Sequence, residues 1–228
     1  MRTYTYNICK CPGCTKPALS EIDKNLTLTQ NPGWCLEHHP NPQKALKRIF
    51  LHIMRNDTII GLTVCGVEVK NLNLGNKRFI GCNLQNCSLT NVHADGLKMR
   101  ICIADNSTFT DCDFIKSDIQ FSSFAGSKIV HVLFTGSNLI HTNFNGATSY
   151  QSSFDDSDLY NTRFIKTVLI NNSFRNCNLK KTVFYESVRD NVSFKLSNTR
   201  EALVDRKRGG LMGDIGINYS DGTSLELL

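Results

Sequence analysis

Cysteine and histidine residues near the start of the chain have the spacing of metal ligands. The stretch "CKCPGC" holds Cys9, Cys11 and Cys14, and "GWCLEHH" places Cys35 three residues before His38. Thiolate sulphur and imidazole nitrogen are preferred ligands of tetrahedral Zn²⁺, and two short ligand pairs joined by a loop can surround one ion. The predicted ligands are Cys9, Cys14, Cys35 and His38. Cys11 is the alternative to Cys9, because Cys11-x2-Cys14 is also an acceptable pair.

We expect this zinc to be structural. Four protein ligands leave no coordination position for a substrate water, and Glu37 is the only adjacent carboxylate that could act as a base. The ion would fold a segment of about 40 residues that is too short for a core of its own. The segment resembles the small treble-clef or knuckle zinc sites of many phage and bacterial proteins, which implies a bacterial source.

A helix is predicted over residues 41–57, "NPQKALKRIFLHIMRND". Asn41 is its expected N-cap and Pro42 lies in its first turn. One apolar face, expected to cover the end of the following structure, consists of Leu46, Ile49, Phe50 and Ile53. The remaining surface is basic through Lys44, Lys47, Arg48 and Arg55. A solvated basic face is the favoured interpretation, and contact with phosphates or acidic protein is the alternative.

The long middle of the chain repeats its apolar residues every five positions. From Phe79 to Phe194 this frame has 24 positions without an insertion, of which 22 are apolar and only Ser149 and Arg189 are not. Neither a helix nor a flat strand has this period. Two residues before each centre, 21 of the 24 positions hold Ala, Cys, Ser, Thr or Val. One large and one small inward residue in each unit predict a solenoid, whose units bury their apolar residues only by stacking.

The repeat resembles the pentapeptide-repeat family. The stretches "SDL" at 157–159, "CNL" at 177–179, "SNL" at 137–139 and "CDF" at 112–114 match its unit directly, and the resemblance covers about residues 59–198. It implies an all-β solenoid, a right-handed quadrilateral β-helix in which each residue lies over the one twenty positions later. One expected internal ladder is Phe114, Phe134, Phe154, Phe174 and Phe194, and a second is Phe124, Phe144, Phe164 and Phe184.

Most of the ten cysteines fit this frame or the metal site. Cys82, Cys87, Cys102, Cys112 and Cys177 fill the small inward position, where a free thiol behaves as a compact apolar group. The first residues contain no apolar signal region, and no segment is long and apolar enough to span a membrane. We therefore expect a cytoplasmic protein with reduced thiols.

The predicted organisation has four parts: a zinc-binding segment (1–40), a capping helix (41–58), the β-helix (59–198), and a C-terminal cap and tail (199–228). "NTREALVDRKRGG" predicts a short helix over the last coil, with Arg206, Lys207 and Arg208 near its end and Gly209 and Gly210 stopping it. Related pentapeptide-repeat proteins pair through their C-termini, so a homodimer is one expected form. Arg189 is expected to turn outward or to pair with Glu186 or Asp190, because an unpaired buried guanidinium is costly.

No nucleophile motif, phosphate loop or dinucleotide fingerprint occurs, so neither an enzyme nor a small-molecule substrate is expected. Stacking the frame by twenty residues instead predicts one apolar patch on the outer surface. Its members are Val130, Tyr150 and Ile170 in one column, and Val168 and Val188 in another. We interpret this patch as a binding face for a protein partner or a second copy, with ordinary β-propensity of an exposed sheet as the alternative.

The charge distribution bears on the choice of partner. The net charge is +6, made up of +4 over residues 1–58, +3 over 59–198 and −1 over 199–228. The best-known activity of the resembled family is mimicry of B-DNA to occupy DNA gyrase, which needs an acidic rod, so gyrase binding is a disfavoured alternative. Nucleic-acid binding through the zinc segment, the basic helix and "RKR" is another. The leading prediction is a non-enzymatic scaffold for an unidentified protein partner.

Overall fold

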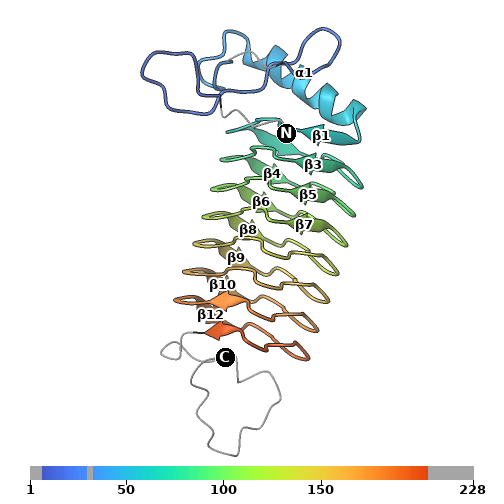
Figure 1. Cartoon of the computed structure of the whole chain (residues 1–228), viewed down its shortest axis with the longest axis vertical. Coiled ribbons are helices and arrows are strands. Elements are labelled where there is room, and N and C mark those ends of the chain that lie inside the picture. The colour runs from blue at the N-terminus through green and yellow to red at the C-terminus, as the bar shows by residue number, and fades with distance from the viewer. Residues whose placement is uncertain (1–6, 30–32, 205–228) are drawn as a thin grey trace, which may run out of the picture.

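The computed structural model describes residues 7–29 and 33–204. These residues form a parallel β-solenoid of about seven turns, with one short helix and an irregular segment over its N-terminal end (Figure 1). Among the described residues no helix is long and apolar enough to cross a membrane. The predicted all-β solenoid is thereby confirmed.

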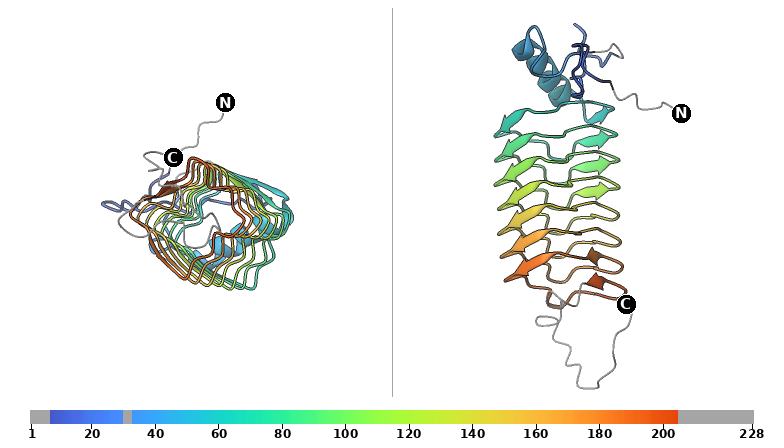
Figure 2. Two further views of the ribbon diagram at one scale, coloured as in Figure 1. Left: turned by 90° about the horizontal axis from the view of Figure 1, so that it is seen from below. Right: turned by 90° about the vertical axis from the view of Figure 1, so that its left-hand side faces the viewer.

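The strands are two or three residues long and pair only in parallel. They are β1 (Thr58–Ile60), β2 (Glu68–Lys70), β3 (Arg78–Ile80), β4 (Ser88–Thr90), β5 (Lys98–Arg100), β6 (Thr108–Thr110), β7 (Asp118–Gln120), β8 (Lys128–Val130), β9 (Thr148–Tyr150), β10 (Val168–Ile170), β11 (Val183–Phe184), β12 (Val188–Asp190) and β13 (Leu203–Val204). One sheet has the order β1-β3-β5-β7, a second β12-β10-β9-β8-β6-β4-β2, and a third β11-β13. The two long sheets lie on opposite sides of the rod (Figure 2).

The register confirms the predicted coil of twenty residues. Phe79 pairs with Met99, and Leu169 pairs with both Ser149 and Arg189. At the bends between sides the backbone enters the left-handed region, as at Asn86 (φ 57°) and Asn91 (φ 53°). Asparagine and glycine tolerate this conformation, and they hold many of these positions.

The interior of the rod from Phe114 to Phe194 is filled by the two predicted phenylalanine ladders. In the first, Phe154 stacks between Phe134 and Phe174 with ring centroids 5.0 and 4.5 Å away. In the second, Phe164 stacks between Phe144 and Phe184 at 5.1 Å from each. Rings of the two ladders meet edge to face, at 5.8 Å between Phe154 and Phe164. Both arrangements are favourable geometries for aromatic rings.

The two polar residues in the apolar frame are both hydrogen-bonded. The Ser149 hydroxyl contacts the Asn172 side-chain oxygen at 2.8 Å, and the Asn172 amide donates to the Ser149 carbonyl at 2.9 Å. Arg189 is partly buried, and it donates to the Phe184 carbonyl at 3.3 Å and the Ser187 hydroxyl at 2.6 Å. These bonds reduce the cost of polar groups in an apolar slot.

The predicted capping helix is present as α1 (Pro42–Arg55). The Asn41 side-chain oxygen accepts the Lys44 backbone N–H at 3.1 Å, as expected of an N-cap. Ile49 and Ile53 are buried in the core of the solenoid. The other end of the helix is held by Lys77, which fills a small inward position and donates to the carbonyls of Met54 and Asn56 at 3.2 and 2.9 Å. A lysine there complements the negative end of the helix dipole.

The predicted C-terminal helix is wrong for residues 199–204. Ala202 continues the small position of the frame and Val204 continues the large one, so the chain forms β13, which pairs with β11. Backbone pairing to the coil below satisfies this segment better than an isolated turn of helix would. The rest of that prediction, Arg206 to Gly210, and the tail with its expected dimer contact lie outside the described residues.

The interior cysteines are expected to resist thiol reagents in the folded protein. Each of Cys82, Cys87, Cys102, Cys112 and Cys177 is buried, and burial raises the pKa of the Cys177 thiol to about 12. Because the thiolate is the reactive form, iodoacetamide at pH 8 should leave these five unmodified, and label them in guanidinium. Mass spectrometry of tryptic peptides measures this, with the partly exposed Cys11 as positive control. Labelling of Cys177 as fast as Cys11 would contradict the prediction.

Candidate metal centre and partner-binding face

A tight loop positions the first pair of predicted ligands. Ile8 pairs antiparallel with Pro17, and the Cys9 N–H donates to the Lys16 carbonyl at 2.9 Å, so the chain closes back on itself. Gly13 turns it with a φ of +78°, a conformation that favours glycine. Cys9 and Cys14 therefore lie on one loop.

A second turn presents the other pair. The His38 N–H donates to the Cys35 carbonyl at 3.2 Å, which places both side chains on one turn just before α1. Backbone hydrogen bonds from Leu19 to the Trp34 carbonyl, and from Lys10 to the Gly33 carbonyl, bring this turn beside the first loop. Backbone hydrogen bonds thus bring together the two pairs of predicted ligands, which are far apart in the sequence.

The four predicted ligand atoms converge to within 4.8 Å of one another. Cys14 Sγ is 3.9 Å from Cys35 Sγ, and His38 Nδ1 is 3.6 Å from Cys9 Sγ and 3.4 Å from Cys35 Sγ. Around tetrahedral Zn²⁺ with ordinary bond lengths, the edges would be about 3.8 Å between sulphurs and about 3.6 Å between sulphur and nitrogen. The group therefore fits a four-coordinate zinc ion.

The environment of Cys9 favours its thiolate. Burial acts to raise its pKa, but hydrogen bonds from the backbone of Cys35 and Cys11 and from the side chains of His38 and Cys35 outweigh it and lower that pKa to about 6. The Cys11 N–H lies 3.5 Å from Cys9 Sγ, whereas the Cys11 side chain is not part of the converging group. Cys9 is thus placed to act as a ligand, and Cys11 supports it through its backbone.

Glu37 is poorly suited to act as a base for a metal-bound water. Its carboxylate forms an exposed ion pair with Lys16, and this hydrogen bond lowers the pKa of Glu37. A general base at neutral pH needs a pKa that is raised toward 7. The arrangement around the metal site accordingly supports a structural role.

The N-terminal segment is packed on the solenoid. The Ser20 N–H donates to the Thr63 carbonyl at 2.9 Å, and the Thr63 N–H donates to the Ser20 hydroxyl at 2.8 Å. Arg48 of α1 donates to the Ile22 carbonyl at 3.3 Å. Leu19 and Ile22 join the buried core of the rod. The metal site, α1 and the first coil therefore form one continuous cap.

The apolar residues predicted as a partner face lie together in the seven-stranded sheet. Val130, Tyr150 and Ile170 are successive partners in the parallel register, and Val168 pairs with Val188 in the neighbouring column. Tyr150 is 38% exposed and Val188 is 44% exposed, while the other three are partly buried. The predicted stacking is confirmed, and the binding role of this valine–tyrosine face stays a prediction.

Comparison with known sequences agrees with the repeat. Residues 127–203 match the family model described as pentapeptide repeat region. This part of the chain is therefore a pentapeptide-repeat region. No curated protein matches the chain. The coil register shows that the same repeat extends from the matched region up to β1.

Several solved pentapeptide-repeat structures are similar to this chain. Rfr23 from the cyanobacterium Cyanothece 51142 is 14% identical, with 66% of this chain and 99% of that chain covered and a TM-score of 0.38. QnrB1, a plasmid-mediated fluoroquinolone resistance protein, is 17% identical over 71% and 93% of the two chains, with a TM-score of 0.27. HetL from Nostoc sp. strain PCC 7120, involved in heterocyst differentiation regulation, is 12% identical over 70% and 93%, with a TM-score of 0.26.

Proposed function

We propose that this protein is a non-enzymatic scaffold that binds a protein partner through its valine–tyrosine face. The observation that carries the proposal is the in-register patch of five apolar side chains on a flat sheet. Contiguous apolar surface of this kind is typical of interaction sites. Because the stacked coils hold the backbone of this face rigid, little conformational entropy would be lost on binding.

A structural zinc ion is part of the same proposal. Its ligands would be Cys9, Cys14, Cys35 and His38, and its role would be to keep the cap folded over the first coil. None of the ten cysteines forms a disulfide, which fits a reducing compartment such as the cytoplasm. The gyrase alternative gains no support from charge, since residues 59–198 hold 14 basic and 11 acidic residues and DNA mimicry needs the opposite excess.

Tyr150→Glu should weaken partner binding strongly without unfolding the rod. Tyr150 is at the centre of the valine–tyrosine face, so a carboxylate there would have to be desolvated against apolar side chains, weakening binding about tenfold or more. The measurement compares proteins retained from lysate by the wild type and the variant, together with the molar mass of each in solution.

Thr90→Glu is the matched control, because Thr90 lies in the same outward column of the sheet but two coils beyond Val130. It should retain every partner. Equal zinc content and equal circular dichroism of the three proteins establish that they fold alike. Identical retained proteins and identical molar masses for wild type and Tyr150→Glu would rule out the face as a binding site.

A further inference from the structure

One corner of the rod combines backbone strain with exposed apolar side chains. The bend that follows the strands β1, β3, β5 and β7 holds one residue from each coil, and these residues stack on one another along the rod. From the N-terminal end they are Gly61, Gly81, Ile101, Phe121 and, in the next coil, His141. Gly61 and Gly81 have φ values of 68° and 59°, which glycine adopts freely. Ile101 and Phe121 have φ values of 55° and 52°, which bulky and especially β-branched residues rarely adopt.

Neither side chain gains burial in return for this strain. Ile101 is 60% exposed and Phe121 is 53% exposed. The Phe121 ring stacks on His141, with centroids 4.8 Å apart and planes at 13°, so its orientation is fixed. Ile103 adds further exposed apolar surface beside them. Bends along the whole rod use the left-handed conformation. This corner differs in placing two exposed apolar side chains in successive coils.

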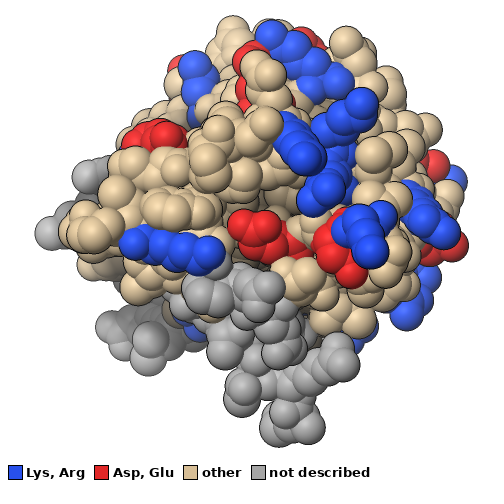
Figure 3. Space-filling model, turned by 90° about the horizontal axis from the view of Figure 1, so that it is seen from above, with Lys and Arg blue, Asp and Glu red and all other residues tan. Residues whose placement is uncertain are grey.

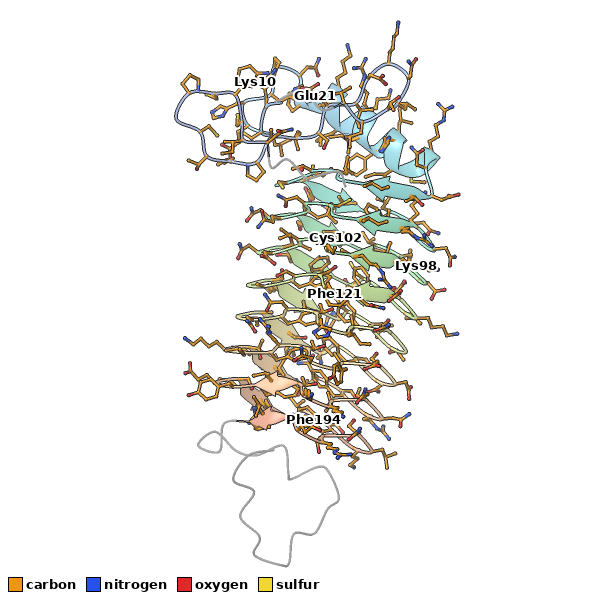
Figure 4. The ribbon with its side chains drawn as sticks, viewed as in Figure 1. Lys10, Glu21, Lys98, Cys102, Phe121 and Phe194 are labelled. Carbon is orange, nitrogen blue, oxygen red and sulfur yellow. The ribbon has the colours of Figure 1, made fainter. Side chains whose placement is uncertain are left out.

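Basic side chains border this corner on the adjacent sheet. Arg78 of β3 and Lys98 of β5 are direct partners in the register, both are exposed, and within the described residues neither has an ion-pair partner. Like charges directly opposite each other destabilise a sheet, and on its other side Lys98 has Asp118 as its register partner. Arg100, next to Ile101, has its Nη2 atom 3.8 Å from Oδ2 of Asp118. Lys98 and Phe121, both labelled in Figure 4, belong to successive coils, because Lys98 pairs with Asp118 just before Phe121.

The cap is also basic. Helix α1 contains Lys44, Lys47, Arg48 and Arg55 and no acidic residue. Seen from the N-terminal end, Lys and Arg side chains gather in one band (Figure 3). Lysines near the positive end of a helix dipole are unfavourable in the absence of an anion. The excess of positive charge on the helix, and on the sheet at Arg78 and Lys98, favours anionic partners.

We propose that Arg78, Lys98, Arg100, Ile101 and Phe121, here called the basic corner, bind an acidic protein segment that carries an apolar side chain. An apolar centre with a charged rim, containing Arg and an aromatic residue, is typical of the energetic centre of protein interfaces. Charge complementarity selects an acidic partner. Nucleic acid is the less favoured occupant, because isoleucine offers no π-face for a base and one face of Phe121 already contacts His141.

This surface is independent of the valine–tyrosine face. The sheet that holds Arg78 and Lys98 lies on the side of the rod opposite the seven-stranded sheet (Figure 2). The rod could therefore hold two partners at once without overlap between them. A test of the basic corner can fail or succeed whatever the outcome at Tyr150.

The test uses the full chain and a phage-displayed library of random 12-residue peptides. Peptides recovered on the wild type should be enriched in Asp and Glu together with Phe, Leu or Ile. Fluorescein-labelled copies then give affinities by anisotropy. Phe121→Asn should weaken binding at least tenfold and at the same time raise the melting temperature, because asparagine tolerates the left-handed conformation. Lys98→Gln should also weaken binding and should reduce its dependence on salt.

Leu196→Asn is the matched control, since Leu196 is an exposed apolar residue with a φ of 64° at a different corner of the rod. It should raise the melting temperature and leave the peptide affinity unchanged. The proposal is overturned if no acidic peptides are enriched, or if Phe121→Asn leaves their affinity unchanged. It is also overturned if fluorescein-labelled (dT)12 binds as tightly as the peptides and competes with them, which would assign the corner to nucleic acid.

Discussion

Chelation of zinc is expected to unfold the N-terminal cap while most of the rod keeps its structure. The loops that carry Cys9 and Cys35 have few buried residues of their own, and zinc contributes about 10–16 kcal/mol of apparent binding free energy in small zinc-dependent domains. Trp34, the only tryptophan in the chain, is next to Cys35 and reports on this segment alone. Its emission should shift to longer wavelength after treatment with EDTA and return when Zn²⁺ is added.

Variants of the ligands sharpen this expectation. Cys35→Ser should lower the zinc content from one ion per chain to none, and should change Trp34 emission in the same way as EDTA. Cys11→Ser should retain the ion, because the Cys11 side chain lies outside the converging group. Loss of zinc in Cys11→Ser together with its retention in Cys9→Ser would make Cys11 the ligand. Binding should also weaken at acid pH, where protons compete for the thiolates.

Phe154→Ala should lower the free energy of unfolding by about 3–5 kcal/mol. Phe154 is fully buried, stacked on Phe134 and Phe174 and in edge contact with Phe144 and Phe164. Each neighbouring ring is held by its own coil, so the cavity cannot collapse and its full cost remains. Urea unfolding followed by circular dichroism measures the effect.

Phe121→Asn provides the comparison for this variant, because it removes a phenylalanine from the surface of the same rod. It should not destabilise the protein. A loss below about 1 kcal/mol for Phe154→Ala would mean that the coils relax around the missing ring, which would contradict the rigid packing described above.

The solenoid could be predicted from the sequence because its period is local and uninterrupted. Each large residue, such as Phe144 or Leu159, is accompanied by a small one two positions earlier, so every unit repeats the same inward pair. Stacking by twenty residues then fixes which side chains are neighbours, including Tyr150 and Ile170. The role of Lys77 could not be predicted, because it depends on where α1 ends in space.

The C-terminal error has a physical explanation. Residues 199–210 contain helix-forming residues and a glycine stop, but Ala202 and Val204 also fit the five-residue frame. Tertiary pairing with β11 outweighed local helix propensity, which contributes only a fraction of a kcal/mol for each residue. The preceding coil provides the strand with which this segment pairs, so the five-residue frame was a better guide to its structure than helix propensity.

The candidate sites were predictable to different degrees. Spacing alone identified Cys14, Cys35 and His38, whereas the choice of Cys9 over Cys11 depends on the loop closed between Ile8 and Pro17. Ile101 and Phe121 were not singled out, because they occupy variable positions outside the frame. A comparison of their column would have revealed them, since its other members are glycine or polar residues, such as Gly61, Gly81 and Asn161.

Because the five-residue frame has no insertions, the number of residues between two positions fixes both their distance along the rod and the angle between the sides on which they lie. Deleting one whole coil of twenty residues would shorten the distance between the ends and leave every side facing as before. Deleting five residues between Phe121 and Val130 would instead turn all later coils by a quarter revolution, so the valine–tyrosine face would no longer point away from the basic corner. In this fold, chain length in steps of five residues encodes the angle between two surfaces, and length in steps of twenty encodes their separation.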